Sequence, residues 1–159
     1  MNPQPSSRSC FVCGRDNPLG LAARWVSDRA AGEVRATVEI PEHFNGYPGT
    51  VHGGIVTALL DEAAVRTLLL DGGFDDLLVT AKLEVAFRRP TPTRTPVVVV
   101  ARLLKRMGTR AQAVAEVRLA DGTVTARAEA LLARPPPEVQ TSWEAERAYW
   151  RVDDGKGPS

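Results

Sequence analysis

Cysteine is scarce in this 159-residue sequence and occurs only as Cys10 and Cys13 of one CxxC motif. No second pair exists to complete a zinc site, so these two residues could bind zinc only with ligands from elsewhere in the chain. A run of about 18 apolar residues, which a transmembrane helix needs, is also missing. The first nine residues carry one arginine and no hydrophobic segment, so we expect no signal peptide and a cytoplasmic location.

An excess of charge is lacking too. The chain has 20 Lys and Arg against 19 Asp and Glu, for a net charge of +1. This balance argues against a protein that mainly grips nucleic acid or an anionic membrane, although a local basic cluster could still bind a small anionic ligand. The nucleotide-binding patterns GxxxxGK[ST] and GxGxxG are missing in a suitable context, and so is the GxSxG elbow. The length fits one domain with a sizeable core.

One segment is typical of a long buried helix, expected from about residue 53 to about residue 70 and ended by a Gly-Gly pair. Apolar side chains surround almost its whole circumference, and Asp61, Glu62 and Arg66 are its only charges. A helix that is apolar all round is normally buried all round. The rest of the domain is therefore expected to wrap it.

Six segments have the alternation or composition of β-strands: two between residues 21 and 40, then 79–88, 96–105, 109–119 and 123–133. An Asp-Gly pair between the last two is a strong hairpin signal. This order predicts an α+β fold in which a curved antiparallel sheet wraps around one long central helix.

The two ends of the chain differ in composition from the predicted domain at 10–134. Residues 1–9 are rich in Pro and Ser and are expected to be disordered. Residues 135–159 are expected to form a Pro-rich linker and a tail, with 153–159 disordered. Within this tail, 142–150 could form a short helix whose aromatic side chains dock on the domain or on a partner chain.

The helix is preceded by His52 and opens with Gly53 and Gly54. Backbone N–H groups in the first turn of a helix lack intrahelical partners and carry a partial positive charge. Such N–H groups can hold the oxyanion that forms when a carbonyl is attacked, and His52 could orient or polarise that carbonyl. The alternative is that the glycines only permit a tight entry into the helix and that His52 holds the turn.

Asp61 lies inside a helix whose side chains are almost all apolar. A buried carboxylate is costly unless it is paired or used. The structural alternative is a salt bridge to Arg66 or partial exposure together with Glu62. The functional interpretation, which we favour, is a carboxylate that activates water or attacks a carbonyl.

His52 and Asp61 are nine residues apart, which corresponds to roughly 180° around the helix and about 13 Å along its axis. They cannot readily serve one reacting carbon from the same chain. If both act on one substrate, they must come from two copies of the helix. The spacing therefore predicts a homodimer with two equivalent, shared sites.

Thr80 is a secondary candidate because its hydroxyl could hold an attacking water. Its parity in the strand matches Lys82 and Glu84, not Leu83, so it is expected to face away from the helix. Six basic residues cluster around the later strands and could pair with the phosphates of coenzyme A, although solvated strand ends would look the same: Arg88, Arg89, Arg94, Lys105, Arg106 and Arg110. No metal site is predicted.

The stretch YPGTVHGGIVTALLDE at residues 47–62 resembles the signature of hotdog-fold acyl-CoA thioesterases of the phenylacetyl-CoA thioesterase (PaaI-like) type. The segments CFVCG and NPLGL near the start resemble one branch of that family, and so does FRRP after the helix. The similarity covers about residues 10–134. It implies a protein that is dimeric and often tetrameric, with an acyl-CoA thioester as substrate and no metal or organic cofactor.

The same resemblance implies roles for individual residues. His52 and the N–H of Gly53 or Gly54 would bind the thioester carbonyl, and Asp61 of the neighbouring chain would act as general base or nucleophile. Two further positions would act on the water or the thioester: Thr80, which matches a Ser/Thr that helps to place the water, and Asn45, which lies near an Asn or Gln that contacts the thioester or the water.

Three other functions compete with the thioesterase. A non-catalytic acyl-CoA-binding, regulatory protein would have little reason to bury Asp61 beside a thioester. A hotdog dehydratase or hydratase normally places its His and acid differently. A structural or interaction protein that uses the CxxC and the aromatic tail would leave the polar residues of the helix unexplained.

Overall fold

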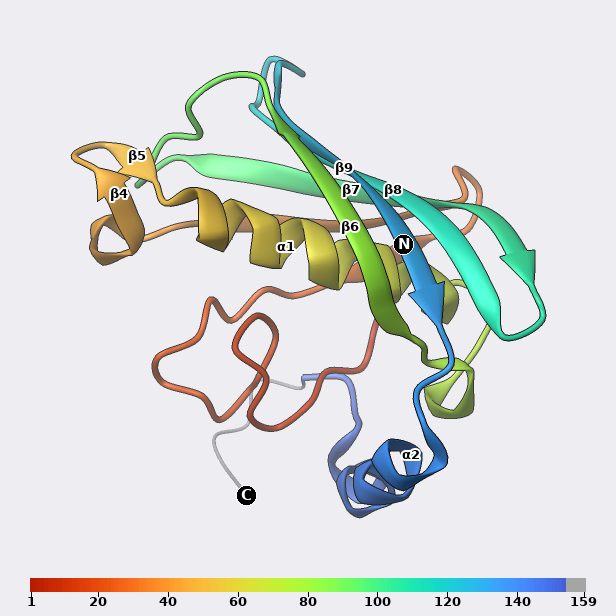
Figure 1. The fold of residues 1–159 in the computed structure, drawn as a ribbon. Helices are drawn as coiled ribbons and strands as arrows, with labels where there is room; N and C mark the ends of the chain where they lie inside the picture. Colours follow the sequence, from red (N-terminus) through yellow and green to blue (C-terminus); the bar gives the residue numbers. More distant parts are fainter. Residues whose placement is uncertain (154–159) are drawn as a thin grey trace.

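The computed structural model describes residues 1–153 and shows a curved antiparallel sheet with one long helix across its inner face (Figure 1). The strands hydrogen-bond in the order β1-β2-β3-β7-β8-β9-β6. Their bounds are β1 Asn2–Pro3, β2 Val26–Asp28, β3 Glu33–Glu39, β6 Val79–Phe87, β7 Pro96–Met107, β8 Arg110–Arg118 and β9 Val124–Ala133. The predicted fold class is confirmed.

A small lobe precedes the central helix. It contains the 3-10 turn η1 Glu42–Phe44 and a two-stranded sheet of β4 Asn45–Tyr47 and β5 Thr50–Val51. Another 3-10 turn, η3 Phe74–Asp76, lies in the connection from the helix to β6. These short elements lie at opposite ends of the helix (Figure 1).

The central helix α1 covers Gly53–Arg66 and continues as the 3-10 turn η2 Thr67–Leu69, which confirms the predicted extent. The chain then leaves the helix at Gly72, whose N–H donates to the Leu68 carbonyl oxygen at 3.2 Å. A Cβ atom at Gly72 would lie 2.6 Å from that same oxygen, so only glycine fits this position.

The sheet-facing side of α1 packs tightly because its partners are small. Leu59, Leu60 and Ala63 have no exposed surface. The buried positions of β8 and β9 that lie under the helix are mostly alanine: Ala111, Ala113, Ala115, Ala126, Ala128 and Ala130. Side chains of this size let the helix axis approach the sheet closely while Leu side chains fill the remaining space.

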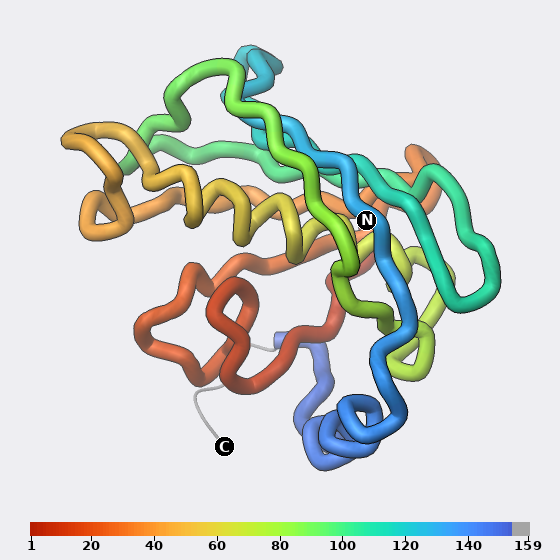
Figure 2. Tube along the Cα trace, in the orientation of Figure 1, coloured from red at the N-terminus to blue at the C-terminus, as the bar shows by residue number. Residues whose placement is uncertain are grey.

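The opposite side of α1 is covered by the first 25 residues, and the expectation that residues 1–9 are disordered is wrong (Figure 2). β1 extends the sheet by pairing with β2. The buried Gln4 side chain donates to Ser27 Oγ at 2.9 Å and to the Arg66 carbonyl at 3.2 Å. Backbone pairing and polar side-chain contacts hold this segment, and a Pro/Ser-rich composition does not reveal either of them.

The tail also folds onto the domain. The helix α2 Pro137–Trp143 is followed by the 3-10 stretch η4 Glu144–Tyr149, so the predicted helix begins earlier than expected. The Trp150 ring meets the Phe74 ring edge-on, with 5.8 Å between their centroids. The prediction that the aromatic side chains dock is confirmed for the domain itself. Of the segment 153–159, residues 154–159 lie outside the described part of the chain.

The strand β6 forms one edge of the main sheet. It pairs with β9 along one side, and its other side has no strand partner among residues 1–153. Its side chains are exposed or half-buried along its whole length, and Phe87 is 57% exposed. A long unpaired edge with apolar side chains is a template for pairing with another strand.

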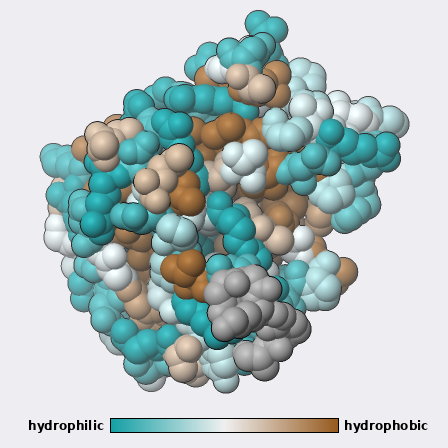
Figure 3. All heavy atoms as spheres, turned by 180° about the vertical axis from the view of Figure 1, so that it is seen from behind, coloured by the Kyte–Doolittle hydropathy of each residue, from teal (hydrophilic) through white to brown (hydrophobic). Residues whose placement is uncertain are grey.

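No helix within residues 1–153 is long and apolar enough to cross a membrane. The face shown in Figure 3 is largely hydrophilic, and hydrophobic residues show in patches between the polar ones.

Candidate active site

His52 is fixed as a hydrogen-bond donor at the start of α1. It is the N-cap of the helix, and its Nδ1 accepts a hydrogen bond from the Gly54 N–H at 2.9 Å. The backbone N–H of His52 donates to the Phe44 carbonyl oxygen at 2.9 Å, so the turn is also held from the preceding segment. A neutral imidazole whose Nδ1 accepts carries its proton on Nε2. The Nε2–H is therefore left to donate to a ligand.

Only one of the two candidate glycine N–H groups is available. The Gly54 N–H is occupied by His52, whereas the Gly53 N–H has no hydrogen-bond partner in the described part of the chain. The unpaired N–H of a first helical turn carries partial positive charge. Gly53 N–H and His52 Nε2–H are thus the two donors that this end of α1 can offer to a carbonyl oxygen.

These donors open onto a cavity of about 710 Å³, which we call the His52 cavity. Residues of β4, β5, the helix start and the end of β6 line it: Gly46, Tyr47, Val51, His52, Gly53, Val56, Phe87, Arg88, Arg89 and Thr91. Two of the predicted phosphate-binding residues, Arg88 and Arg89, therefore lie beside the carbonyl-binding donors.

The other four basic residues predicted to pair with phosphates do not line this cavity: Arg94, Lys105, Arg106 and Arg110. Arg106, near the end of β7, pairs with Asp76 at 3.3 Å, and Arg110 begins β8. The hairpin between β7 and β8 lies at the far end of the sheet from the connection between β6 and β7, where Arg88 and Arg89 lie (Figure 1). The prediction grouped all six residues because they are close in sequence to strand ends, but successive connections in an antiparallel sheet alternate between its two opposite ends.

Asp61 lines a second cavity of about 480 Å³, which we call the Asp61 cavity. Of the two predicted alternatives, the salt bridge to Arg66 is wrong, because Arg66 Nε donates to Glu62 Oε1 at 2.9 Å. Partial exposure together with Glu62 is confirmed, because both side chains are half-buried. The half-buried Asp61 has no ion pair or hydrogen bond from its carboxylate to the residues described. Most of the wall is apolar and comes from three separate segments: Val65, Phe74, Leu77, Leu78, Val79, Trp143 and Trp150.

Thr80 lines the same cavity as Asp61, although its parity predicted that it faces away from the helix. The register between β6 and β9 shifts between Thr80 and Lys82, and this bulge reverses the alternation that the prediction assumed. The Thr80 Oγ1 is buried and has no hydrogen-bond partner among residues 1–153. Asp61 and Thr80 therefore present an unpaired carboxylate and an unpaired hydroxyl to one apolar cavity.

The two cavities have no lining residue in common. One contains the donors at the helix start, and the other contains the carboxylate and the hydroxyl. One chain consequently does not bring His52 and Asp61 to a single reacting group.

Asn45 lies near the His52 turn but does not line the His52 cavity. Its Nδ2 donates to Glu42 Oε1 at 2.9 Å, and the Gly49 N–H donates to the same oxygen at 3.0 Å. The hydroxyl of Thr93 also donates to Glu42, and these hydrogen bonds lower the Glu42 pKa to about 2, with that of Thr93 contributing most. Glu42, which the sequence did not single out, therefore stabilises the lobe before α1 by accepting hydrogen bonds from Asn45, Gly49 and Thr93.

Much of the chain is similar to known proteins. Residues 48–126 match the family described as the thioesterase superfamily. The rat (Rattus norvegicus) protein acyl-coenzyme A thioesterase THEM4 is 27% identical over 105 residues, which are 66% of this chain and 44% of the rat protein. This chain thus spans less than half the length of that relative.

Two solved structures share the fold. The crystal structure of a thioesterase superfamily protein is 31% identical, with a TM-score of 0.71, and the match covers 79% of this chain and 60% of that one. A phenylacetic acid degradation-related protein of Ralstonia eutropha JMP134 is 24% identical, with a TM-score of 0.63 over 71% of this chain and 85% of its own. The second match concerns the fold alone.

Proposed function

We propose that this chain is a thioesterase of the superfamily whose model it matches over residues 48–126, and that it hydrolyses an acyl-CoA thioester to a carboxylic acid and CoA in sites that two copies of the chain share. The observation that carries this proposal is the separation of the two half-sites. The His52 cavity offers hydrogen-bond donors for a carbonyl, and the Asp61 cavity offers a carboxylate without a partner. Each half lacks what the other provides.

The strand β6 supplies a way to join the halves. Its Phe87 end lines the His52 cavity, and its start at Thr80 lines the Asp61 cavity. If the free β6 edges of two chains pair around a two-fold axis, the strands run antiparallel. The Phe87 end of one chain then lies beside the partner's Thr80. This pairing makes two equivalent sites, each with His52 from one chain and Asp61 from the other.

The chemistry follows from the groups present. His52 Nε2–H and Gly53 N–H bind the thioester carbonyl oxygen and stabilise the negative charge that it gains. The partner's Asp61 takes a proton from a water held by the partner's Thr80, and the water oxygen attacks the carbonyl carbon. The tetrahedral intermediate collapses, the C–S bond breaks, and the sulfur leaves as the CoA thiolate, which then takes up a proton. Direct attack of the carboxylate would instead form a mixed anhydride that water hydrolyses.

The substrate is placed by the two cavities. Arg88 and Arg89 lie at the His52 cavity, where they would pair with phosphates of CoA. The apolar wall of the Asp61 cavity would take the acyl group. An acyl-CoA has a charged CoA part and an apolar acyl part, which are joined at the thioester. The CoA part matches the His52 cavity, and the acyl part matches the Asp61 cavity.

The proposal is tested by measuring the release of CoA thiol from a panel of acyl-CoAs. Loss of a general base typically costs a factor of about 10²–10⁴, so Asp61→Ala should lose at least about a hundredfold in turnover on any acyl-CoA that the wild type hydrolyses. Asp71→Asn, at a 93% exposed side chain, is the matched control and should keep wild-type turnover. Binding of acyl-CoA without turnover by the wild type would contradict the enzyme and favour a non-catalytic acyl-CoA-binding protein.

A further inference from the structure

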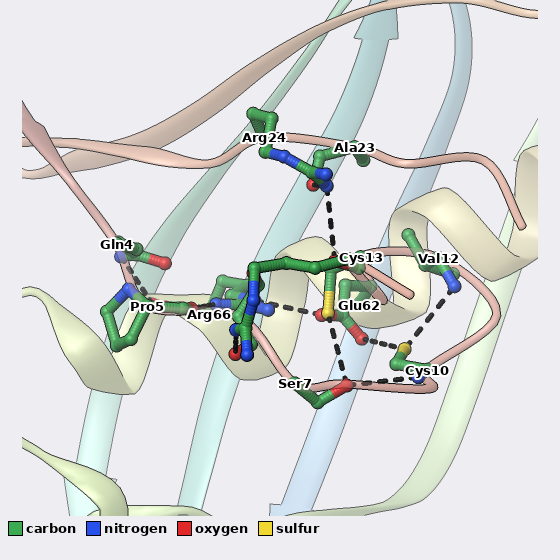
Figure 4. Close-up of polar contacts among 12 residues, drawn as sticks. Gln4, Pro5, Ser7, Cys10, Val12, Cys13, Ala23, Arg24, Glu62 and Arg66 are labelled. Carbon is green, nitrogen blue, oxygen red and sulfur yellow. Dashed lines mark hydrogen bonds and ion pairs between the residues drawn. The ribbon is translucent and has the colours of Figure 1, made fainter. Parts of the chain in front are cut away.

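The CxxC motif gains a third metal-ligand candidate from α1. Cys10 Sγ lies 3.8 Å from Glu62 Oε2, and both sulfur atoms and the carboxylate oxygen lie within 4.8 Å of one another (Figure 4). In the sequence, Cys13 and Cys10 lie 49 and 52 residues before Glu62. Folding of the N-terminal segment over α1 brings the three together.

The backbone around the motif favours a negatively charged sulfur. The Val12 N–H donates to Cys10 Sγ at 3.3 Å, and the Cys10 N–H donates to Ser7 Oγ at 3.0 Å. The turn closes through the Gly14 N–H, which donates to the Cys10 carbonyl oxygen at 2.8 Å. A Cβ atom at Gly14 would lie 2.4 Å from that oxygen, so the turn requires glycine here.

The two sulfur atoms differ in their contacts. Cys10 Sγ accepts from the Val12 N–H at 3.3 Å, and Cys13 Sγ lies 4.0 Å from Ser7 Oγ. Cys10 is half-buried and Cys13 is buried. The thiolate, not the thiol, is the form that binds metals.

The surrounding charges balance when a divalent cation is present. Arg66 is 2% exposed, and its Nη2 has no hydrogen-bond partner among the described residues. Two thiolates and the Glu62 carboxylate carry three negative charges, which Arg66 and a divalent cation together neutralise. Arg66 also bonds the Glu62 oxygen that faces away from Cys10, and such contacts orient a carboxylate ligand.

We propose that Cys10, Cys13 and Glu62 bind one thiophilic divalent cation, Zn²⁺, with water in the fourth position. Thiolate and carboxylate ligands in a CxxC turn suit tetrahedral Zn²⁺. Binding of Zn²⁺ releases the thiol protons to solvent. The bound ion links the N-terminal segment to α1, because the two cysteines belong to that segment and Glu62 belongs to the helix. Because all three ligands line the Asp61 cavity, the metal also fixes part of the wall of that cavity. A disulfide between the two cysteines would remove the Cys10 thiol that donates to the Glu62 carboxylate.

The test uses the full chain, purified with a thiol reductant and without chelator. Elemental analysis should find about one Zn²⁺ per chain, because each chain contains one such set of ligands. Replacement by Co²⁺ should give the intense visible bands of a tetrahedral site and a near-ultraviolet thiolate-to-cobalt band. Glu62→Gln should weaken Co²⁺ binding by more than the roughly 10–100-fold that loss of a mere orienting partner costs. Asp71→Asn is the control, and circular dichroism checks that each variant is folded.

Three results would overturn the proposal. The first is wild-type protein that retains no Zn²⁺ after incubation with the metal and dialysis. The second is an intact mass that shows the cysteines joined as a disulfide under the same reductant. The third is Co²⁺ binding that is unchanged in a folded Glu62→Gln variant. None of these results depends on hydrolysis of a thioester, so the metal site and the proposed activity fail separately.

Discussion

The replacement Thr80→Val should separate stability from activity. The Thr80 hydroxyl is buried without a hydrogen-bond partner in the described chain, and it faces the Asp61 cavity. An unsatisfied buried hydroxyl costs roughly 1–3 kcal/mol, and valine has nearly the same shape. We therefore expect Thr80→Val to raise the free energy of unfolding by up to that amount. For a chain of this size the corresponding rise in Tm is about 2–12 °C.

The same replacement should lower turnover. In the proposed mechanism the hydroxyl holds the attacking water, so its loss should reduce kcat on an acyl-CoA by at least about tenfold, the minimum expected from a lost positioning contact of about 1.4 kcal/mol. Thermal unfolding and CoA release are measured at one fixed protein concentration, because association also shifts Tm.

Thr125→Val is the matched control. The Thr125 side chain is fully buried, its hydroxyl accepts from Thr91 at 2.8 Å, and it donates to the Val117 carbonyl oxygen at 3.3 Å. Its removal deprives the buried Thr91 hydroxyl of its acceptor and removes the bond to the Val117 carbonyl oxygen, and it should destabilise the protein by about 1–3 kcal/mol. The reasoning is refuted if Thr80→Val is destabilised as much as Thr125→Val, or if Thr80→Val keeps wild-type turnover.

Three further changes test the packing, the lobe before α1 and the tail. Leu60→Ala, at a side chain with no exposed surface, should lower the free energy of unfolding by about 2–5 kcal/mol in urea titrations, and a loss below about 1 kcal/mol would contradict the packing of α1 on the sheet. The pKa of Glu42 is lowered to about 2, so its hydrogen bonds should be fully present above its ordinary value near 4.5 and should be lost as the pH falls through about 2. A carboxyl titration by NMR that gives an ordinary midpoint would argue against the contacts with Thr93 and Gly49. Trp150→Ala should raise KM for acyl-CoAs with bulky apolar acyl groups more than for acetyl-CoA, because the ring lines the Asp61 cavity; equal KM values would show that the tail does not touch the acyl group.

The architecture was predictable because its signals are local and periodic. The apolar circumference of residues 53–70 identified α1, and alternation identified the strands that became β6, β7, β8 and β9. The nine-residue separation of His52 and Asp61 predicted that one chain does not bring both to one reacting carbon, and within the chain they line different cavities. Each of these inferences used spacing along one element.

What could not be predicted depends on contacts between distant segments or on local irregularity. The bulge after Thr80 reverses the facing of that side chain, and no residue in the strand marks it. The position of residues 1–9 on the domain depends on hydrogen bonds from Gln4 to Ser27 and to the Arg66 carbonyl, which are distant in the sequence. The approach of Glu62 to Cys10 joins positions 52 apart in sequence, so neither residue alone indicates the other.

The central claim is that each active site uses His52 from one chain and Asp61 from the other. It is tested by combining His52→Ala and Asp61→Ala chains, each inactive alone, under two different affinity tags and isolating the mixed dimer. One site of that dimer then contains both wild-type residues and the other contains neither, so we predict about half of the wild-type activity per dimer. Activity in the mixed dimer no higher than in either variant alone would contradict the shared site.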